Sequence, residues 1–197
     1  MKDLRFEEAQ LLSKIEHLSR HDRTAFAGAC AERMLRAYFK FSDRTGRGNP
    51  HKLREILTRL WSDLAGNAMS EAEAEAQIRE TNDLIPCADD LPWVPEQPAA
   101  EDAAEAVAYA LRSRQSGSSQ EAVWAAYCAY EALDDFVINQ EHIDTNIEGA
   151  HARVLAHPLI QAELLRQQRD LEEILRGTIT LQQLRERSKE EAAYFLP

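Results

Sequence analysis

The sequence has few of the residues that interrupt regular structure: seven glycines and seven prolines among 197 residues. It also lacks the alternation of apolar and polar residues that predicts half-buried strands. Its one stretch of period two, EAEAEA at 71–76, consists of strong helix formers. These absences argue against sandwiches and barrels, which need many short strands separated by turn residues. They predict an all-α chain.

Cysteines and long hydrophobic runs are also scarce. Cys30, Cys87 and Cys128 lie far apart and form no CxxC pair, which is typical of free thiols in a reducing compartment. The longest apolar run, from Ala122 to Tyr130, falls well short of the about 20 residues that a membrane span needs. The opening stretch MKDLRFEEAQ is charged where a signal peptide is apolar. We therefore expect a cytoplasmic protein without a membrane partner.

Positive charge is in deficit, because the chain carries a net charge of −11 at pH 7. A nucleic-acid binder neutralises phosphates with Lys and Arg, so this balance argues against nucleic acid as a partner. The charge is also uneven: residues 71–105 hold eleven acidic residues and one basic residue, whereas 32–59 hold eight basic and three acidic ones. Either the two surfaces face each other, inside the fold or across an oligomer, or both are solvated helix faces.

What the sequence does contain is helical periodicity along most of its length. Leu53, Ile56, Leu57, Leu60 and Leu64 recur at helical spacing, and other stretches show similar stripes. We expect helices at 3–19, 22–45, 50–65, 70–83, 99–116, 119–147, 158–176 and 180–194. The stretch 121–138 is apolar on most sides, which places it at the centre of the fold beside 22–45. The fold class predicted is all-α: a single-domain antiparallel bundle of about seven to eight helices over 1–197.

The stretch RTGRGNPHKLR at 44–54 is the first candidate site. Its flexible glycines and the cations of Arg44, Arg47 and Lys52 could bind an anion at the start of a helix. However, the P-loop pattern is absent, no strand precedes the turn, and Pro50 lacks an N–H group. The simpler interpretation is a hinge, in which Gly46 ends one helix and Asn49 caps the next. Both interpretations stay open.

Paired carboxylates are the second candidate. Asp89 and Asp90 lie in the proline-rich segment 84–98, and Asp134 and Asp135 follow Glu131 on the central helix. A carboxylate on an apolar helix has a raised pKa when buried, which suits acid–base chemistry. Alternatively these groups cap helices, pair with arginines such as Arg33 or Arg36, or reach solvent.

Metal and nucleophile motifs are missing. A di-iron bundle needs two Glu-x-x-His units, and only Glu148 with His151 has that spacing, so we expect no metal and no cofactor. There is no GxSxG motif, and Cys30 and Cys128 lie on apolar stripes, where they are interpreted as small core residues. No catalytic residue is predicted.

Four stretches of the chain resemble a bacterial family, domain of unknown function 416, the YjaG-like proteins. They are CAERMLRAYFKFSDRTGRG at 30–48, LREILTRLWSDL at 53–64, IPCADD at 85–90 and AVAYALRSRQSG at 106–117. The resemblance implies an all-helical cytoplasmic protein, with no activity or cofactor to carry over. It places Glu32, Arg33, Asp89 and Asp90 in the family-like pattern, and we hypothesise that Arg33 binds Asp89 or Asp90 and so holds the proline-rich segment to the bundle.

Two functions follow from these observations. The scarcity of chemical motifs and the uneven charge favour a non-enzymatic interaction module, whose partner is another protein or a second copy of the chain. The alternative is a small-molecule or anion-binding protein, or an enzyme, that uses the basic turn 44–54 or the Asp89/Asp90 segment.

Overall fold

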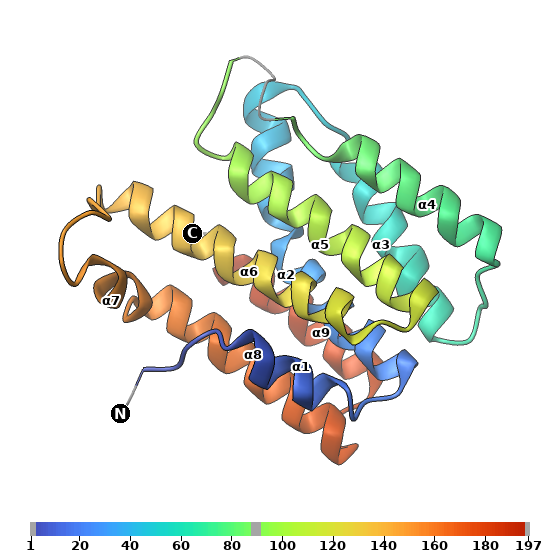
Figure 1. Ribbon diagram of the computed structural model, residues 1–197. Helices are drawn as coiled ribbons and strands as arrows, with labels where there is room; N and C mark the ends of the chain where they lie inside the picture. Colours follow the sequence, from blue (N-terminus) through green and yellow to red (C-terminus); the bar gives the residue numbers. More distant parts are fainter. Residues whose placement is uncertain (1–2, 88–91, 196–197) are drawn as a thin grey trace.

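A computed structural model describes residues 3–87 and 92–195, and every regular element in these residues is a helix. The all-α prediction is therefore confirmed. The described residues form nine α-helices rather than seven to eight (Figure 1). They are α1 Glu8–Ile15, α2 Arg20–Thr45, α3 Pro50–Leu64, α4 Glu71–Leu84, α5 Gln97–Ser116, α6 Ser119–Gln140, α7 Ala150–Leu155, α8 Pro158–Arg176 and α9 Leu181–Glu191, followed by the 3₁₀ turn Ala192–Tyr194.

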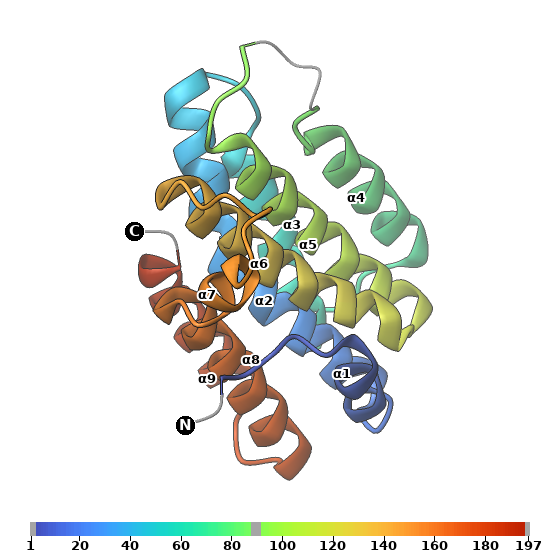
Figure 2. The same cartoon turned by 60° about the vertical axis from the view of Figure 1, so that its left-hand side comes forward.

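Helix α2 lies at the centre of the bundle. It packs against α5 most extensively and also contacts α3, α6, α8 and α9, as the two views in Figures 1 and 2 show. Its buried positions run around most of its surface and include Phe26, Met34 and Phe41. A helix that is buried on nearly all sides must be surrounded by others. The apolar stretch 121–138, which was expected to be surrounded too, lies in α6: it packs against α2, but its outer side leaves Trp124 and Tyr127 exposed.

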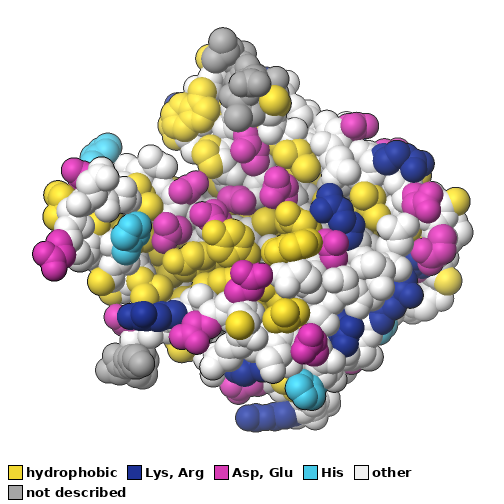
Figure 3. All heavy atoms as spheres, in the orientation of Figure 1, with side chains coloured by type: hydrophobic (Ala, Val, Ile, Leu, Met, Phe, Trp, Pro, Cys, Tyr) yellow, Lys and Arg dark blue, Asp and Glu magenta, His cyan; other side chains and the backbone are white. Residues whose placement is uncertain are grey.

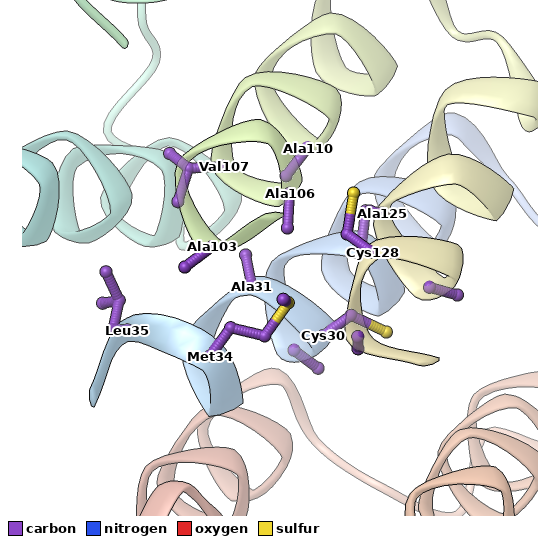
Figure 4. Close-up of a cluster of buried hydrophobic side chains, with 14 of the residues drawn as sticks. Cys30, Ala31, Met34, Leu35, Ala103, Ala106, Val107, Ala110, Ala125 and Cys128 are labelled. Carbon is purple, nitrogen blue, oxygen red and sulfur yellow. The ribbon is translucent and has the colours of Figure 1, made fainter. Parts of the chain in front are cut away.

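Helices α5 and α6 form an antiparallel hairpin against α2, joined by a short turn at Gly117 (Figure 1). Figure 4 shows Ala103, Ala106 and Ala110 of α5 between α2 and α6. All three side chains are fully buried. Small side chains let helix backbones approach closely, so polar residues at the edge of this contact lie close together across the hairpin.

Two predicted helices differ from the structure. The expected helix 119–147 ends at Gln140, because His142 has a left-handed φ of 51° and Gly149, with φ 83°, starts the separate helix α7. The expected helix 3–19 is shorter, spanning Glu8–Ile15. The residues before it are not helical, and the backbone N–H and carbonyl of Leu4 both pair with the side-chain amide of Gln161, at 2.8 and 2.9 Å.

A buried network of charges joins α2 to α8 and α9. The Arg33 guanidinium is fully buried and donates to Glu163 at 2.9 Å and to Asp170 at 2.8 Å. Arg187 from α9 donates to the other Asp170 oxygen at 2.7 Å. Because each buried carboxylate meets a guanidinium, the desolvation of these charges is offset by direct pairing.

Candidate functional site

The cations of the basic turn are paired within the protein. Arg44 forms an ion pair with Glu96 at 2.6 Å, and Lys52 forms one with Glu80 at 3.0 Å. Arg47 donates to the carbonyl of Pro92 and to the side chain of Gln97. Arg44 and Arg47 are thus directed to neighbouring residues at the start of α5, whereas Lys52 is directed to α4, so the three candidate anion ligands do not converge on one point.

The glycines of this turn have structural reasons to be there. Gly46 ends α2 with a left-handed φ of 67°, and Asn49 caps α3 by accepting a hydrogen bond from the Lys52 N–H. At Gly48, where φ is 75°, an added Cβ would lie 2.6 Å from the Tyr38 hydroxyl, which itself donates to the Leu84 carbonyl. The turn therefore has the geometry of the hinge interpretation, with a close approach that only glycine allows.

Glu32 and Arg33, the second candidate group, are both buried in ion pairs. Glu32 accepts hydrogen bonds from Arg54 at 2.5 Å and from the Trp61 ring at 3.0 Å. Arg33 belongs to the α8 network described above. Asp89 and Asp90 lie outside the described residues, so the hypothesis that Arg33 binds one of them stays a prediction.

The acidic and basic stretches of the sequence meet inside the fold. Besides the pairs of Arg44 and Lys52, Arg59 on α3 binds Glu73 on α4 at 2.7 Å. This arrangement matches the interpretation in which the two charged surfaces face each other. The acidic residues at 101–105 are not part of it.

The unpaired acids line a hollow of about 520 Å³ on the outer face of the α5–α6 hairpin. Its lining, called the acidic hollow below, consists of Glu8, Asp102, Glu105, Tyr109, Trp124, Tyr127, Cys128 and Glu131. In Figure 3, acidic side chains gather on this face beside a band of hydrophobic ones. Asp102 and Glu105 are one turn apart on α5, and Cys128 and Glu131 are one turn apart on α6, so the antiparallel hairpin brings the two pairs together.

No described cation forms an ion pair with this cluster, although Arg112, over the Tyr109 ring, is near enough to oppose the rise in the pKa of Glu105. Asp102, Glu105 and Asp135 have no side-chain hydrogen bond or ion pair with any residue that the structure describes. The Tyr127 hydroxyl donates to Glu131, while the Glu131 Oε2 atom is buried without a hydrogen-bond partner. Such groups are costly to leave without a counter-charge.

The electrostatics of the acidic hollow follow from this lack of cations. Burial, together with repulsion from neighbouring carboxylates, Glu105 first, raises the pKa of the Asp102 carboxyl to about 8. Burial also raises the pKa values of Glu105 and Asp135. The pKa of the Cys128 thiol is raised by burial and then by repulsion from Asp102. A cation entering the hollow would relieve this repulsion.

Aromatic side chains surround the acids. Trp124 and Tyr127 are 40% and 42% exposed, which is unusual for rings of this size. Trp124 lies 5.5 Å from the Tyr109 ring, and Phe6 lies 5.3 Å from Tyr127, between ring centroids. The face therefore combines negative charge with exposed aromatic surface, a chemistry suited to cations.

A second hollow of about 520 Å³ lies at the other end of the hairpin. Its walls include Trp93, which is 53% exposed, together with Phe136, Lys40 and His142. His142 is the one non-glycine residue with positive φ among the described residues. This Trp93 hollow has the same volume as the acidic one but more apolar walls, which suit a small molecule better. Asp135 of α6 also lines it, so this carboxylate lies beside the acidic hollow rather than in its lining.

Sequence reasoning found part of this site. It singled out Glu131, Asp134 and Asp135, but it passed over Asp102 and Glu105 and assigned Cys128 to the core. The missed signal was the pair at i, i+3 on α5, facing a similar pair on α6 across a short turn.

Within the described residues, no helix is both long enough and apolar enough to cross a membrane.

Comparisons with known proteins agree with the fold. The sequence model of a family described as "Protein of unknown function (DUF416)" matches residues 10–193. The chain is 30% identical over 108 residues to the uncharacterized protein YjaG of Escherichia coli (strain K12). These 108 aligned residues cover 55% of this chain and 54% of that protein. The match thus spans about half of the relative. A crystal structure of a DUF416 family protein from Shewanella baltica OS155 superposes with a TM-score of 0.77 over 93% of both chains, at 22% identity.

Proposed function

The chain belongs to the DUF416 family, whose function is unknown, and from its geometry we propose that it is a non-enzymatic interaction module of the cytoplasm. It docks a partner protein on the outer face of the α5–α6 hairpin. The partner presents an amphipathic segment that carries Lys or Arg side chains. The observation that carries this proposal is the acidic hollow, whose carboxylates form no ion pair with any described residue and have only Arg112 near them.

Charge complementarity argues for a basic partner. Four carboxylates, those of Asp102, Glu105, Glu131 and Asp135, lie close enough that burial and mutual repulsion raise the pKa of Asp102. A Lys or Arg side chain that enters the hollow replaces this repulsion with attraction. Opposite potentials across an interface also speed association and reject partners of the wrong charge.

The aromatic rim argues for a protein segment rather than for a simple ion. Trp124 and Tyr127 offer flat, half-exposed faces over which a guanidinium or ammonium group gains about 0.5–2 kcal/mol. Aromatic anchors of this kind carry much of the binding energy in protein interfaces. An amphipathic segment would cover the rings and place its cations on the acids.

A different protein fits this face better than a second copy of the chain. The most basic part of the sequence, residues 32–59, is engaged internally through the ion pairs of Arg44, Lys52, Arg54 and Arg59. The same pairing argues against the alternative of an anion site in the basic turn.

The test uses a fluorescein-labelled peptide with a helical repeat of Leu and Lys, and follows its anisotropy as the full chain is added. We expect saturable binding that weakens with salt. Glu105→Lys in the acidic hollow should weaken binding at least tenfold, and Trp124→Ala by about tenfold, a loss of about 1.4 kcal/mol. Glu172→Lys on α8 is the control, because it makes the same charge change outside the face.

Two outcomes would contradict the proposal. If Glu172→Lys weakens peptide binding as much as Glu105→Lys does, the attraction belongs to the net charge rather than to the hairpin. If the wild-type chain does not bind the peptide at low salt, the face does not recognise basic segments. Circular dichroism establishes that each variant is folded.

The Trp93 hollow supports a second candidate function, the binding of a small molecule. Its volume and its apolar walls suit a drug-sized ligand. In a thermal-shift screen, a ligand at one hundred times its Kd would stabilise the native state by about 2.7 kcal/mol. Trp93→Phe should abolish any change in tryptophan fluorescence on binding. A ligand that stabilises the chain without changing the emission of Trp93 binds outside this hollow.

A further inference from the structure

We propose that the floor of the acidic hollow binds a divalent transition-metal ion of the zinc type, through Asp102, Glu105 and Cys128. One carboxylate oxygen from each acid and the Cys128 sulfur all lie within 4.8 Å of one another. Bond lengths to zinc are about 2.0–2.2 Å for oxygen and about 2.3 Å for sulfur, so ligand atoms around one ion are separated by less than about 4.5 Å. Small rotations of the side chains bring the three atoms to that spacing.

The buried thiol distinguishes this cluster from an ordinary group of surface acids. The Cys128 side chain is 3% exposed, it lines the hollow, and no other described residue forms a hydrogen bond with its sulfur. Glu131 contributes a second buried group, the Oε2 atom that has no partner. Two buried polar groups without partners thus meet the acids at one place, which is expected where a ligand completes their interactions.

Cys30 provides the internal comparison. It is equally buried, but its sulfur accepts a hydrogen bond from Arg33 at 3.5 Å and so has a partner within the protein. Figure 4 shows the sulfurs of Cys30 and Cys128 pointing in different directions. Of these two buried thiols, the one that lines the acidic hollow is the one without a partner.

The charge balance suits a divalent ion. Binding converts the Cys128 thiol to a thiolate and removes the proton that Asp102 holds near neutral pH; both protons pass to solvent, and the metal bonds form without any oxidation or reduction. Three anionic ligands around a 2+ ion leave a net charge of −1. A fourth ligand from Glu131 would bring it to −2, the value of a zinc site with four cysteines. Thiolate and carboxylate donors together favour zinc over calcium or magnesium, which prefer oxygen ligands.

The ligands come from two helices, so the ion would crosslink α5 to α6. This inference does not require the proposed docking function, although both use the acids of the same hollow. A 2+ ion neutralises two of the negative charges on the face, and the remaining acids still repel one another. The aromatic rings that anchor the peptide are not metal ligands.

The experiment uses the full chain without a histidine tag. Equilibrium dialysis against Zn²⁺ should give one ion per chain, and Co²⁺ should produce the near-ultraviolet absorption band of a cobalt–thiolate bond. Cys128→Ser should abolish that band, and Asp102→Asn should weaken Zn²⁺ binding at least tenfold. Cys87→Ser, which removes the exposed thiol, should change neither result.

Three results would overturn the metal site: no bound Zn²⁺ in dialysis, a cobalt–thiolate band that survives Cys128→Ser, or a band lost with Cys87→Ser. Circular dichroism of the metal-free variants shows whether a loss reflects unfolding. Trp124→Ala separates the two proposals, because it should weaken peptide binding and leave Zn²⁺ binding unchanged. Failure of the peptide test therefore does not decide the metal test.

Discussion

The Arg33 network and the acidic hollow are both clusters of charged side chains, one buried in the bundle and one on the outer face of the α5–α6 hairpin. They differ in whether their carboxylates are paired with cations. Around Arg33, the buried carboxylates of Glu163 and Asp170 each meet a guanidinium within 3 Å. In the acidic hollow, Asp102 and Glu105 form no ion pair with any described residue, and only Arg112 lies near enough to act on Glu105. The first cluster is complete within the chain, and the second is not.

This difference separates charges that hold the fold from charges that are available to a ligand. A buried ion pair contributes little net stability, but it fixes which helices meet, because a wrong packing leaves a charge unpaired. A group of unpaired carboxylates lowers stability and persists where it serves recognition. The two regions therefore predict opposite responses to the removal of charge.

The largest expected effect is that of Arg33→Met. The substitution leaves Glu163 and Asp170 buried without their common partner, and breaking a buried pair in this way costs about 3–5 kcal/mol. Urea unfolding monitored by circular dichroism measures the loss. Arg36→Met, on the same helix, removes an exposed donor to the Ala193 carbonyl and should cost less than about 1 kcal/mol. Equal losses would show that the network is not what holds α8 to α2.

An intermediate effect is expected at Asp63, which joins α3 to α5. Burial opposes ionisation of this carboxyl, but hydrogen bonds from Arg114 and from the Met69 N–H outweigh burial and lower its pKa. The stabilisation is therefore present above the unfolded-state pKa of about 3.9 and is lost as pH falls through the lower native pKa. Asp63→Asn should cost about 1–2 kcal/mol at pH 7. The difference from wild type should shrink once pH falls below the unfolded-state pKa; a difference that stays constant as pH falls would contradict the charge pairing.

The smallest effect has the opposite sign. Burial and repulsion from Glu131 raise the native pKa of Asp135, so the native state holds this proton more tightly than the unfolded chain does. Below the unfolded-state pKa of Asp135 the carboxyl is protonated in both states, so the repulsion does not affect stability. Above the native pKa it is ionised in both states, and the repulsion destabilises the native state in full. Asp135→Asn should therefore stabilise the metal-free protein at pH 8, by about 0.5 kcal/mol because solvent screens this partly exposed group. Thermal unfolding at pH 8 and pH 4 measures this, and a loss of stability at pH 8 would place an unseen cation beside Asp135.

The sequence predicts the helical class and several helix ends, because periodicity and caps are local. The stripe from Leu53 to Leu64 is buried along α3, and the expected cap at Asn49 with Pro50 is present. The break after Gln140 was missed because it depends on His142 adopting a left-handed conformation, which no residue type requires. The family was recognised from its motifs, and the family match confirms it.

The two charge clusters were harder to predict, because they depend on register between helices. The pairing of Arg33 with Asp89 or Asp90 stays a prediction, but the sequence did not indicate its partners on α8, which lie 130 and 137 residues away. The acidic hollow requires that Asp102 and Cys128 face each other, which only the docking of α5 on α6 determines. Helical spacing indicated that Cys128 is buried, but not that its sulfur faces acids.

The non-helical start of the chain has a consequence for experiments. The Gln161 side chain forms hydrogen bonds with both the N–H and the carbonyl of Leu4, and the Phe6 ring packs against the rings of Tyr127 and Tyr130. Removing the residues before α1 would expose the aromatic rings of Tyr127 and Tyr130 next to the docking face. Dimers of such a truncated protein would form through apolar surface that the truncation itself exposed.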